Sequence, residues 1–357
     1  MSEISSVSVR PVDIPLDSPF EIALGTQTAA ENLFVRVETE AGAVGIGEAA
    51  PHSAVTGATR DAALAQARDA AAVVRGRESG NYRAVVDDLR DTFPGMVSAN
   101  VALEAAVLDA HCRERGVPLS ELFGGQPTPL ETDVTVSMVS PEKARASAAR
   151  AADDGYGTVK VKTGDAVEES VARVEAVAEA HPDCEITVDA NQGWSPAAAI
   201  RFCREMADRG VDLALVEQPV PADDVGGLAE VKRRVEPPVA ADEAVFTPAD
   251  ALRVVEREAA DVINVKLAKS GLIDGHRIAS VARAGDVDLM IGCMLESAVG
   301  LHAAAHLVAG IGGVFHVDLD GNVSHSEHLG GEEPSPTLDP SGPGHGVRPA
   351  IEWDTQG

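Results

Sequence analysis

Short apolar runs alternate with amphipathic stretches through the second half of the chain. Each run fits a strand, and each following stretch, rich in Ala, Glu and Arg, fits a helix. The eight runs are TDVTVSM, GTVKVK, CEITVDA, VDLALVEQP, PPVAADE, DVINVK, VDLMIGC and GVFHVDLD. Lys162, Asp189, Glu217, Asp242 and Lys266 fall in successive runs at intervals of 24 to 28 residues. This spacing predicts βα units and favours a compact (β/α)8 barrel, with a doubly wound open sheet as the alternative.

The rest of the chain has a different texture. Residues 1–40 alternate between apolar and polar positions as strands do, and residues 60–115 are Ala-rich with a helical period. A loop rich in Gly and Pro at 123–129 marks a boundary, and the tail from 325 onward contains no further βα unit. The sequence therefore predicts three parts: an α+β capping domain over 1–127, a (β/α) barrel catalytic domain over 128–324, and a tail over 325–357 that packs back on the capping domain.

The large negative net charge of the chain argues against several kinds of binding partner. A formal net charge of −28, spread along the 357 residues, disfavours nucleic acid and anionic membranes as partners. It is typical of a halophilic protein, because concentrated salt screens the repulsion between carboxylates. The chain has no apolar run long enough to span a membrane and no signal-peptide pattern, and its four cysteines form no CxxC pair. We therefore expect a cytoplasmic protein.

Carboxylates end three consecutive apolar runs. In a (β/α)8 barrel the active site lies at the carboxyl ends of the strands, so Asp189, Glu217 and Asp242 are expected to converge on one point. Their mutual repulsion in a partly buried barrel mouth would be costly without a cation. All-oxygen ligation suits Mg²⁺, and the lack of His or Cys at these strand ends argues against zinc. The sequence thus predicts a magnesium site.

Lysine is rare in this chain, and four of its six lysines flank the acids in two short clusters. Lys160 and Lys162 are two residues apart on one strand, so both should point inward, while Lys266 lies on the opposite side of the barrel. Neighbouring ammonium groups should lower each other's pKa toward neutrality. Two such bases suit removal of a proton from one face of a carbon and its return to the other. Two alternatives stay open here: lysines that only pair with the acids, and an acidic metal-binding scaffold without catalysis.

Five motifs then point to a family: TVKVKTG, ITVDANQGW, LVEQP, ADEAV and INVKLAKSG. In this order they resemble the enolase superfamily, specifically its muconate-lactonizing subgroup, over nearly the whole chain. The resemblance implies Mg²⁺ held by Asp189, Glu217 and Asp242, an acid/base pair of Lys162 and Lys266, and Lys160 as a helper beside the substrate carboxylate. It implies an enediolate intermediate, and a lid formed by the N-terminal domain and the tail. Homo-oligomers are common in this family, and the sequence leaves the oligomeric state open.

Two later segments favour one activity within the subgroup. GCMLES (292–297) and VDLDGN (317–322) are similar to the seventh and eighth strands of dipeptide epimerases. Asp318 and Asp320 project to the same side of a strand and could bind the free α-ammonium of a dipeptide. The resemblance therefore implies an isomerase acting on a small-molecule dipeptide. The alternatives are o-succinylbenzoate synthase, muconate-type cycloisomerase and N-acylamino acid racemase, and the substrates of the first two carry no ammonium group.

One departure from the family bears on specificity. Epimerases acting on Ala-Glu place an arginine in the early capping loop, whereas the corresponding stretch here, EIALGTQTA, has Gly25 and no base. We therefore expect a neutral or apolar second residue in the dipeptide, with a basic one as the alternative in such acidic surroundings. Thr135 on the first barrel strand and Glu296 on the seventh are further candidate substrate contacts.

Overall fold

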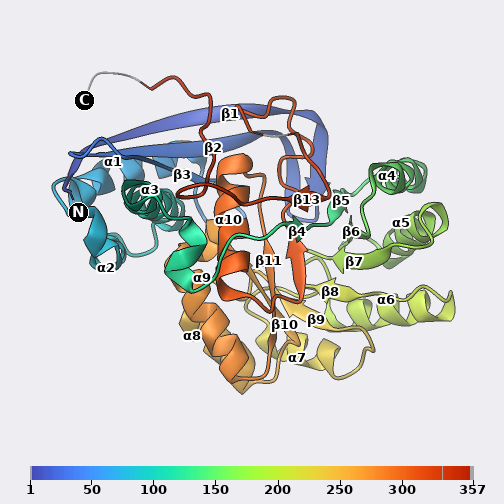
Figure 1. Ribbon diagram of the computed structural model, residues 1–357. Coiled ribbons are helices and arrows are strands. Elements are labelled where there is room, and N and C mark those ends of the chain that lie inside the picture. Colours follow the sequence, from blue (N-terminus) through green and yellow to red (C-terminus); the bar gives the residue numbers. More distant parts are fainter. Residues whose placement is uncertain (1, 332, 354–357) are drawn as a thin grey trace.

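The N-terminal part of the chain is a small sheet covered by helices (Figure 1). The computed structural model describes residues 2–331 and 333–353. Its antiparallel sheet has the order β1-β2-β3 and packs against α1 and α3. A Cβ on Gly45 would lie 2.1 Å from the carbonyl oxygen of Ala106, so glycine lets α3 approach the sheet closely. The elements are β1 (Ile4–Ile22), β2 (Gly25–Thr39), β3 (Val44–Ala49), α1 (Arg60–Val74), η1 (Ser79–Asn81), α2 (Tyr82–Thr92), α3 (Val97–Arg115) and η2 (Leu119–Phe123).

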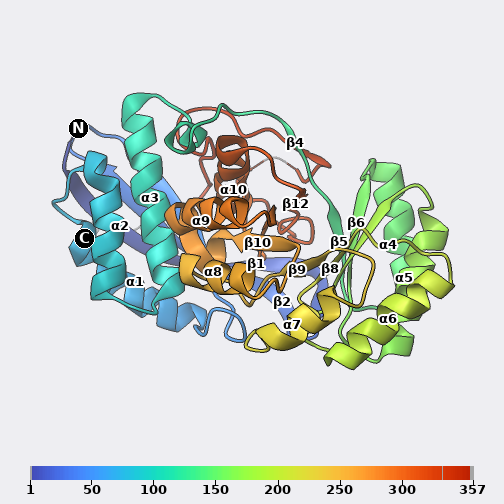
Figure 2. The ribbon, with the colours of Figure 1, turned by 90° about the horizontal axis from the view of Figure 1, so that it is seen from below.

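Eight parallel strands follow and form a nearly closed barrel in the order β5 to β12. This confirms the predicted (β/α) barrel and excludes the doubly wound alternative. The strands are β5 (Val134–Val136), β6 (Thr158–Lys162), β7 (Glu185–Asp189), β8 (Leu215–Glu217), β9 (Val239–Ala241), β10 (Val262–Lys266), β11 (Asp288–Gly292) and β12 (His316–Asp318). The helices between them are α4 (Pro141–Asp154), α5 (Val167–Ala180), α6 (Pro196–Asp208), α7 (Val225–Lys232), α8 (Pro248–Glu256), α9 (Leu267–Ala284) and α10 (Ala298–Ile311). Seen from below, α8 to α10 lie between the N-terminal helices and α4 to α6 (Figure 2).

Three barrel helices begin at a Ser-Pro or Thr-Pro pair. The side chains of Ser140, Ser195 and Thr247 each accept a hydrogen bond from a backbone N–H of the first helical turn. The proline that follows each cap has its φ angle preset for a helix and lacks an N–H that would otherwise be unpaired. These local signals fix where α4, α6 and α8 start, and so fix the lengths of the loops that precede them.

The side chains inside the barrel change from apolar to charged along the strands. The apolar layer is a separate buried cluster of Leu215, Ala240, Val262 and Met290. Two residues further along three of these strands stand Glu217, Asp242 and Asn264, which share the inward direction because side chains alternate with a period of two. The strand sequences thus place a layer of apolar side chains inside the barrel, directly below the polar side chains of the site.

Hydrogen bonds of the backbone and of side chains close the barrel between β5 and β12, the two end strands of the described sheet. Leu319 N donates to Thr132 Oγ1 at 2.8 Å, and Asp133 N donates to the carbonyl of Val317 at 3.3 Å. His316 Nε2 lies 2.8 Å from Asp133 Oδ2. In the described residues β12 is followed by turns, not by a helix, so these contacts hold the last strand in place.

The long β1–β2 hairpin reaches from the capping domain to the barrel, where its tip lies beside β5 (Figure 1). Met138 N, just after β5, donates to the carbonyl of Glu21 at 2.8 Å. Asp17 N donates to the carbonyl of Ser324, in the loop after β12, at 2.9 Å. The hairpin is therefore attached to both end strands of the barrel and covers its mouth.

The C-terminal tail returns to the capping domain. Val347, Ile351 and Trp353 pack against a buried cluster that contains Phe34 and Ile46. The short strand β13 (Thr337–Leu338) pairs with β4 (Leu130–Glu131). The tail and the N-terminal part thus form one cap, as the fold prediction states. None of the helices in the described residues is both long and apolar enough to cross a membrane.

Candidate active site

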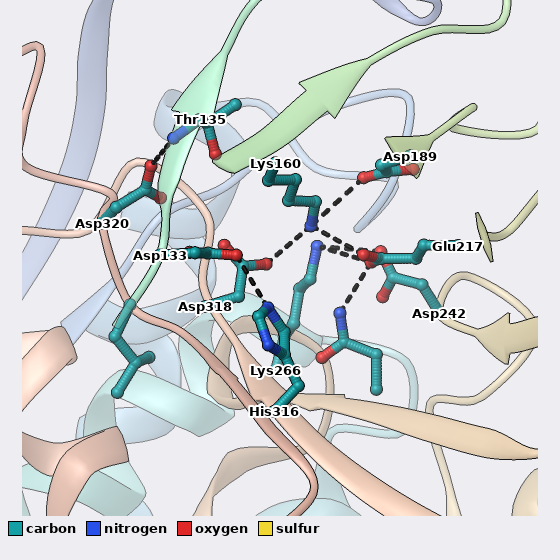
Figure 3. A network of polar contacts seen from close by, with 12 residues as sticks. Asp133, Thr135, Lys160, Asp189, Glu217, Asp242, Lys266, His316, Asp318 and Asp320 are labelled. Atoms are coloured by element: carbon teal, nitrogen blue, oxygen red, sulfur yellow. Dashed lines mark hydrogen bonds and ion pairs between the residues drawn. The ribbon is translucent and has the colours of Figure 1, made fainter. Parts of the chain in front are cut away.

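Three acids meet at the carboxyl ends of consecutive strands (Figure 3). Asp189 ends β7 and Glu217 ends β8, and the two are register partners; Asp242 directly follows β9. One carboxylate oxygen from each lies within 4.8 Å of the others, and all three residues are buried. Three buried carboxylates with oxygen donors only are a ligand set for a hard divalent cation. The structure therefore brings together the three predicted ligands.

Lys160 reaches the centre of this acidic cluster (Figure 3). Its Nζ lies 2.7 Å from Glu217 Oε2 and 2.6 Å from Asp318 Oδ2, with Asp189 Oδ2 at 3.4 Å. The side chain is only 1% exposed. A fully buried ammonium of this kind is stable only among opposite charges, and these three carboxylates provide them.

Lys162 and Lys266 contact different acids of the trio. Lys162 Nζ lies 2.7 Å from Asp189 Oδ2, and Lys266 Nζ lies 2.8 Å from Asp242 Oδ2. Lys162 comes from β6 and Lys266 from β10, four strands apart in the barrel. The two amines therefore flank the acidic cluster on opposite sides, which is the geometry that a two-base reaction needs.

The surrounding acids raise the pKa values of Lys160 and Lys266. Burial lowers the pKa of Lys160, but the charges of Asp318 and Glu217 outweigh it and hold the pKa well above its usual range. For Lys266 the same balance, against Asp242 and Glu217, also raises the pKa well above its usual range. The prediction that Lys160 and Lys162 lower each other's pKa stays a prediction, because in this structure the nearby carboxylates outweigh every lowering contribution to the pKa of Lys160.

Further polar residues support the three acids. Asn264 Nδ2 donates to Glu217 Oε1 at 2.7 Å, and Lys269 Nζ lies 2.6 Å from Asp242 Oδ1. Neither residue has a role that was predicted from the sequence. Asn264 could have been found from the strand period, since it lies two positions before Lys266 and must share its inward direction. Lys269 lies in the first turn of α9, and no sequence spacing shows that its side chain turns back to Asp242.

A cavity of about 910 Å³ lies at the barrel mouth beneath the hairpin. Its wall includes seven predicted site residues, namely Thr135, Lys160, Lys162, Asp242, Lys266, Asp318 and Asp320. The hairpin contributes Phe20 and Ile22, and His52 and Val55 come from the loop after β3. This volume lies within the range typical of small-molecule sites, so the acids and lysines face a space that can hold a substrate.

The acid pair after β12 is built into the wall of the cavity. Asp318 pairs with Lys160, and Asp320 Oδ2 accepts a hydrogen bond from Thr135 N at 2.5 Å. Burial and the charge of Asp318 raise the pKa of Asp320 to about 6, so it is ionised at neutral pH. The pair thus presents negative charge to the cavity on the side away from Asp242.

Two predicted features lie elsewhere. Glu296 is buried but does not line the cavity: Glu296 Oε2 accepts a hydrogen bond from Met294 N, and burial beside Glu48 raises its pKa to about 8. The structure therefore places Glu296 outside the cavity wall, and a substrate contact at this residue stays a prediction. Gly25, with φ of +140°, forms the hairpin turn and lies outside the cavity wall, whereas Phe20 and Ile22 line it.

The comparisons with known proteins show the family of this chain. Residues 143–353 match the enolase C-terminal domain-like model, and residues 4–124 match the N-terminal domain of the mandelate racemase / muconate lactonizing enzymes. Barrel, cap and relatives together define an isomerase of the racemase and epimerase class. The chain belongs to the enolase superfamily, in its mandelate racemase / muconate lactonizing enzyme family.

Three relatives are informative. The L-Ala-D/L-Glu epimerase of Bacillus subtilis is 37% identical over 89% of this chain and 88% of its own. The hydrophobic dipeptide epimerase of Citrifermentans bemidjiense is 37% identical over 97% of this chain and 98% of its own. The structure of the dipeptide epimerase from Enterococcus faecalis V583, complexed with Mg and L-Leu-L-Tyr, is 32% identical with a TM-score of 0.92, covering 96% of this chain and 99% of that one.

Proposed function

We propose that this protein is a Mg²⁺-dependent epimerase that inverts the α-carbon of the C-terminal residue of a dipeptide. The observation that carries the proposal is the placement of Lys162 and Lys266 on opposite sides of the three acids, at one cavity that also contains Asp318 and Asp320. Relatives named as dipeptide epimerases support it.

The cation fits the residues present. Asp189, Glu217 and Asp242 would hold it, because three buried carboxylates with no nitrogen or sulfur donor suit Mg²⁺. Asn191 Oδ1 and Glu243 Oε2 are buried oxygen atoms near the three acids, and neither accepts a hydrogen bond among the described residues. Such unpaired oxygens also suit a bound cation. When bound, the cation would supply positive charge for the substrate carboxylate as the α-proton leaves.

The lysines would exchange the proton. A cation held by the three acids would offset the negative charge that raises the pKa of Lys266. One of Lys162 and Lys266 would then take the α-proton as a neutral amine, leaving the enediolate of the substrate, and the other would return a proton from the opposite face. Lys160, held among the carboxylates, is placed to neutralise the charge that develops on the substrate carboxylate. Asp318 and Asp320 would bind the α-ammonium of the N-terminal residue and so place the second α-carbon between the lysines.

The cavity wall indicates the side chain that is accepted. Phe20, Ile22 and Val55 present apolar surface from the cap, and no arginine lies on the described hairpin tip between Glu21 and Ala30. We propose an apolar C-terminal residue. Lys143 and Arg150 of α4 also line the cavity, so acidic dipeptides are the contrasting test substrates.

An exchange screen tests the proposal. Dipeptides with apolar, acidic and basic second residues are incubated with the protein and Mg²⁺ in D₂O, and deuterium is measured by NMR at the second α-carbon. We expect exchange and inversion, fastest for apolar residues and lost with EDTA. The absence of exchange across the whole library would refute the epimerase.

A charge-neutral variant separates the proposal from its alternatives. Asp318→Asn with Asp320→Asn should raise KM for dipeptides at least about tenfold, because the ammonium loses two charged partners. Synthesis of o-succinylbenzoate or cycloisomerisation that this variant leaves intact would favour those activities instead, since their substrates carry no ammonium group.

A further inference from the structure

Arg173 is a buried arginine of α5 that lies behind the active site. It is 5% exposed. Its Nε donates to the carbonyl of Val139 at 2.8 Å, and its Nη1 donates to the carbonyl of Lys162 at 3.0 Å. One rigid guanidinium therefore joins the main chain at the end of β6 to the main chain that follows β5.

The charge of this arginine is balanced locally. Arg173 Nη2 lies 2.5 Å from Asp165 Oδ2, in the loop after Lys162. Ser170 also donates to Asp165, and Trp194 Nε1 donates to the carbonyl of Asp165 at 2.8 Å. Because Trp194 belongs to the loop after β7, the Arg173–Asp165 pair ties together the segments that follow three neighbouring strands.

The same arginine reaches the hairpin through one intervening residue. Val139 adjoins Met138, whose N–H donates to the carbonyl of Glu21 at the hairpin tip. Residues 138 and 139 are thus held by the hairpin on one side and by Arg173 on the other. Arg173 connects the segment on which the cap is docked to the backbone of Lys162.

Lys266 is supported differently. It is the N-cap residue of α9, which begins at Leu267, and its carbonyl accepts a hydrogen bond from Ser270 Oγ at 3.3 Å. The start of a helix therefore fixes its backbone without any help from Arg173. Loss of Arg173 should therefore change the position of the Lys162 backbone and leave that of Lys266 unchanged.

We infer that Arg173 is a positioning residue for Lys162, which couples docking of the β1–β2 hairpin to the alignment of this amine. The inference rests on the proposed function, since it assigns the two lysines to opposite faces of the substrate. An error of about 1 Å in the position of a reacting group can cost about a hundredfold in rate, so a loosened Lys162 backbone should have a measurable effect.

The test measures α-deuterium exchange separately for the two epimers of one dipeptide in D₂O. In each exchange the α C–H bond breaks, its proton passes to a lysine amine, and that lysine returns a solvent-derived deuteron to the same face. Lys266→Ala and Lys162→Ala show which epimer each amine serves. Arg173→Lys keeps the positive charge but loses the planar guanidinium that binds two carbonyl groups at once. It should slow exchange of the epimer that Lys162 serves by about tenfold to a hundredfold relative to exchange of the other epimer.

Arg113→Lys is the matched control. The side chain of Arg113 is also buried, pairs with Asp109 at 2.8 Å and donates to the carbonyl of Val347. These contacts join the C-terminal tail to α3, and they do not involve Lys162. It should leave the ratio between epimers unchanged. Equal slowing of both epimers by Arg173→Lys, or the same asymmetry in Arg113→Lys, would overturn the inference.

Two further measurements keep the outcome decisive. If circular dichroism shows that Arg173→Lys does not fold, Asp165→Asn is the second variant, because it removes the charge that balances Arg173. It should slow α-deuterium exchange more for the epimer that Lys162 serves than for the other epimer. Equal slowing of the two epimers by Asp165→Asn would refute the positioning role of Arg173. If the wild-type protein exchanges neither epimer, the proposed function itself is refuted. If the wild type exchanges both epimers and Arg173→Lys slows both equally, only the positioning role of Arg173 is refuted.

Discussion

At the scale of single residues, position on a strand decides which charges meet. Lys162, Asp189 and Glu217 are register partners on three neighbouring strands, so their alignment follows from the ladder. Asp318 and Lys160 are 158 positions apart in the chain and lie 2.6 Å apart in the fold. The strand ends could be predicted from periodicity, whereas this contact depends on the closure of the barrel.

The lysine pair gives the first prediction at this scale. Lys162→Ala and Lys266→Ala should each lower the rate of epimerisation by about 10² to 10⁴, because each removes one general base. Each variant should still exchange the α-proton of one epimer with D₂O. Lys232→Ala is the control, since Lys232 pairs with Asp261 away from the cavity. Variants of both catalytic lysines with unchanged rates would favour a non-catalytic metal-binding scaffold.

At the scale of elements, the cap fixes the start of a barrel helix. Within α9, Gly271 has φ of +69° and interrupts the helix, and Glu104 of α3 accepts a hydrogen bond from Ile273 N at 2.6 Å just beyond it. A Cβ at Gly271 would lie 2.6 Å from Glu104 Oε2, so this capping contact requires glycine. Arg90 pairs with the same carboxylate. The part of α9 that follows the break at Gly271 is thus held by the N-terminal domain.

Glu104 makes this element sensitive to pH. Burial raises its pKa from 4.5 to about 7, against the opposing charge of Arg90. Between these values the folded protein holds a proton that the unfolded chain has lost, so stability falls as pH rises from 4.5 to 7. The free energy of unfolding of the wild type should decline by about 3 kcal/mol more than that of Glu104→Gln over this range. Urea unfolding at a series of pH values measures this, and parallel profiles would contradict it.

At the scale of the whole molecule, the net charge of −28 opposes the compact state. The cationic side chains of the site are engaged by site carboxylates, as with Lys160 and Lys266, so they do little to offset the acidic surface. Arginine forms most of the surface ion pairs, for example with Asp88 and Glu168. Exposed pairs of this kind contribute little to stability, which leaves screening by salt as the main relief.

We therefore expect the stability of the protein to depend on salt. The melting temperature should rise between dilute buffer and molar KCl, because ions screen the repulsion between exposed carboxylates. The double variant Glu258→Asn and Asp286→Asn removes two exposed charges at positive-φ positions that asparagine tolerates, and it should lose less on dilution. A melting temperature that is the same in dilute and molar salt would refute the halophilic interpretation.

The sequence by itself determined the barrel and the inward positions of the acids and lysines. Both follow from local rules: the period of two along a strand, the recurrence of βα units, and caps such as Ser195 and Thr247. Tertiary structure decided what those rules do not reach. It turned Glu296 away from the cavity, brought Lys269 to Asp242, and placed Arg173 behind Lys162. These contacts join loops and helix starts, whose directions are set by packing and not by any repeat in the sequence.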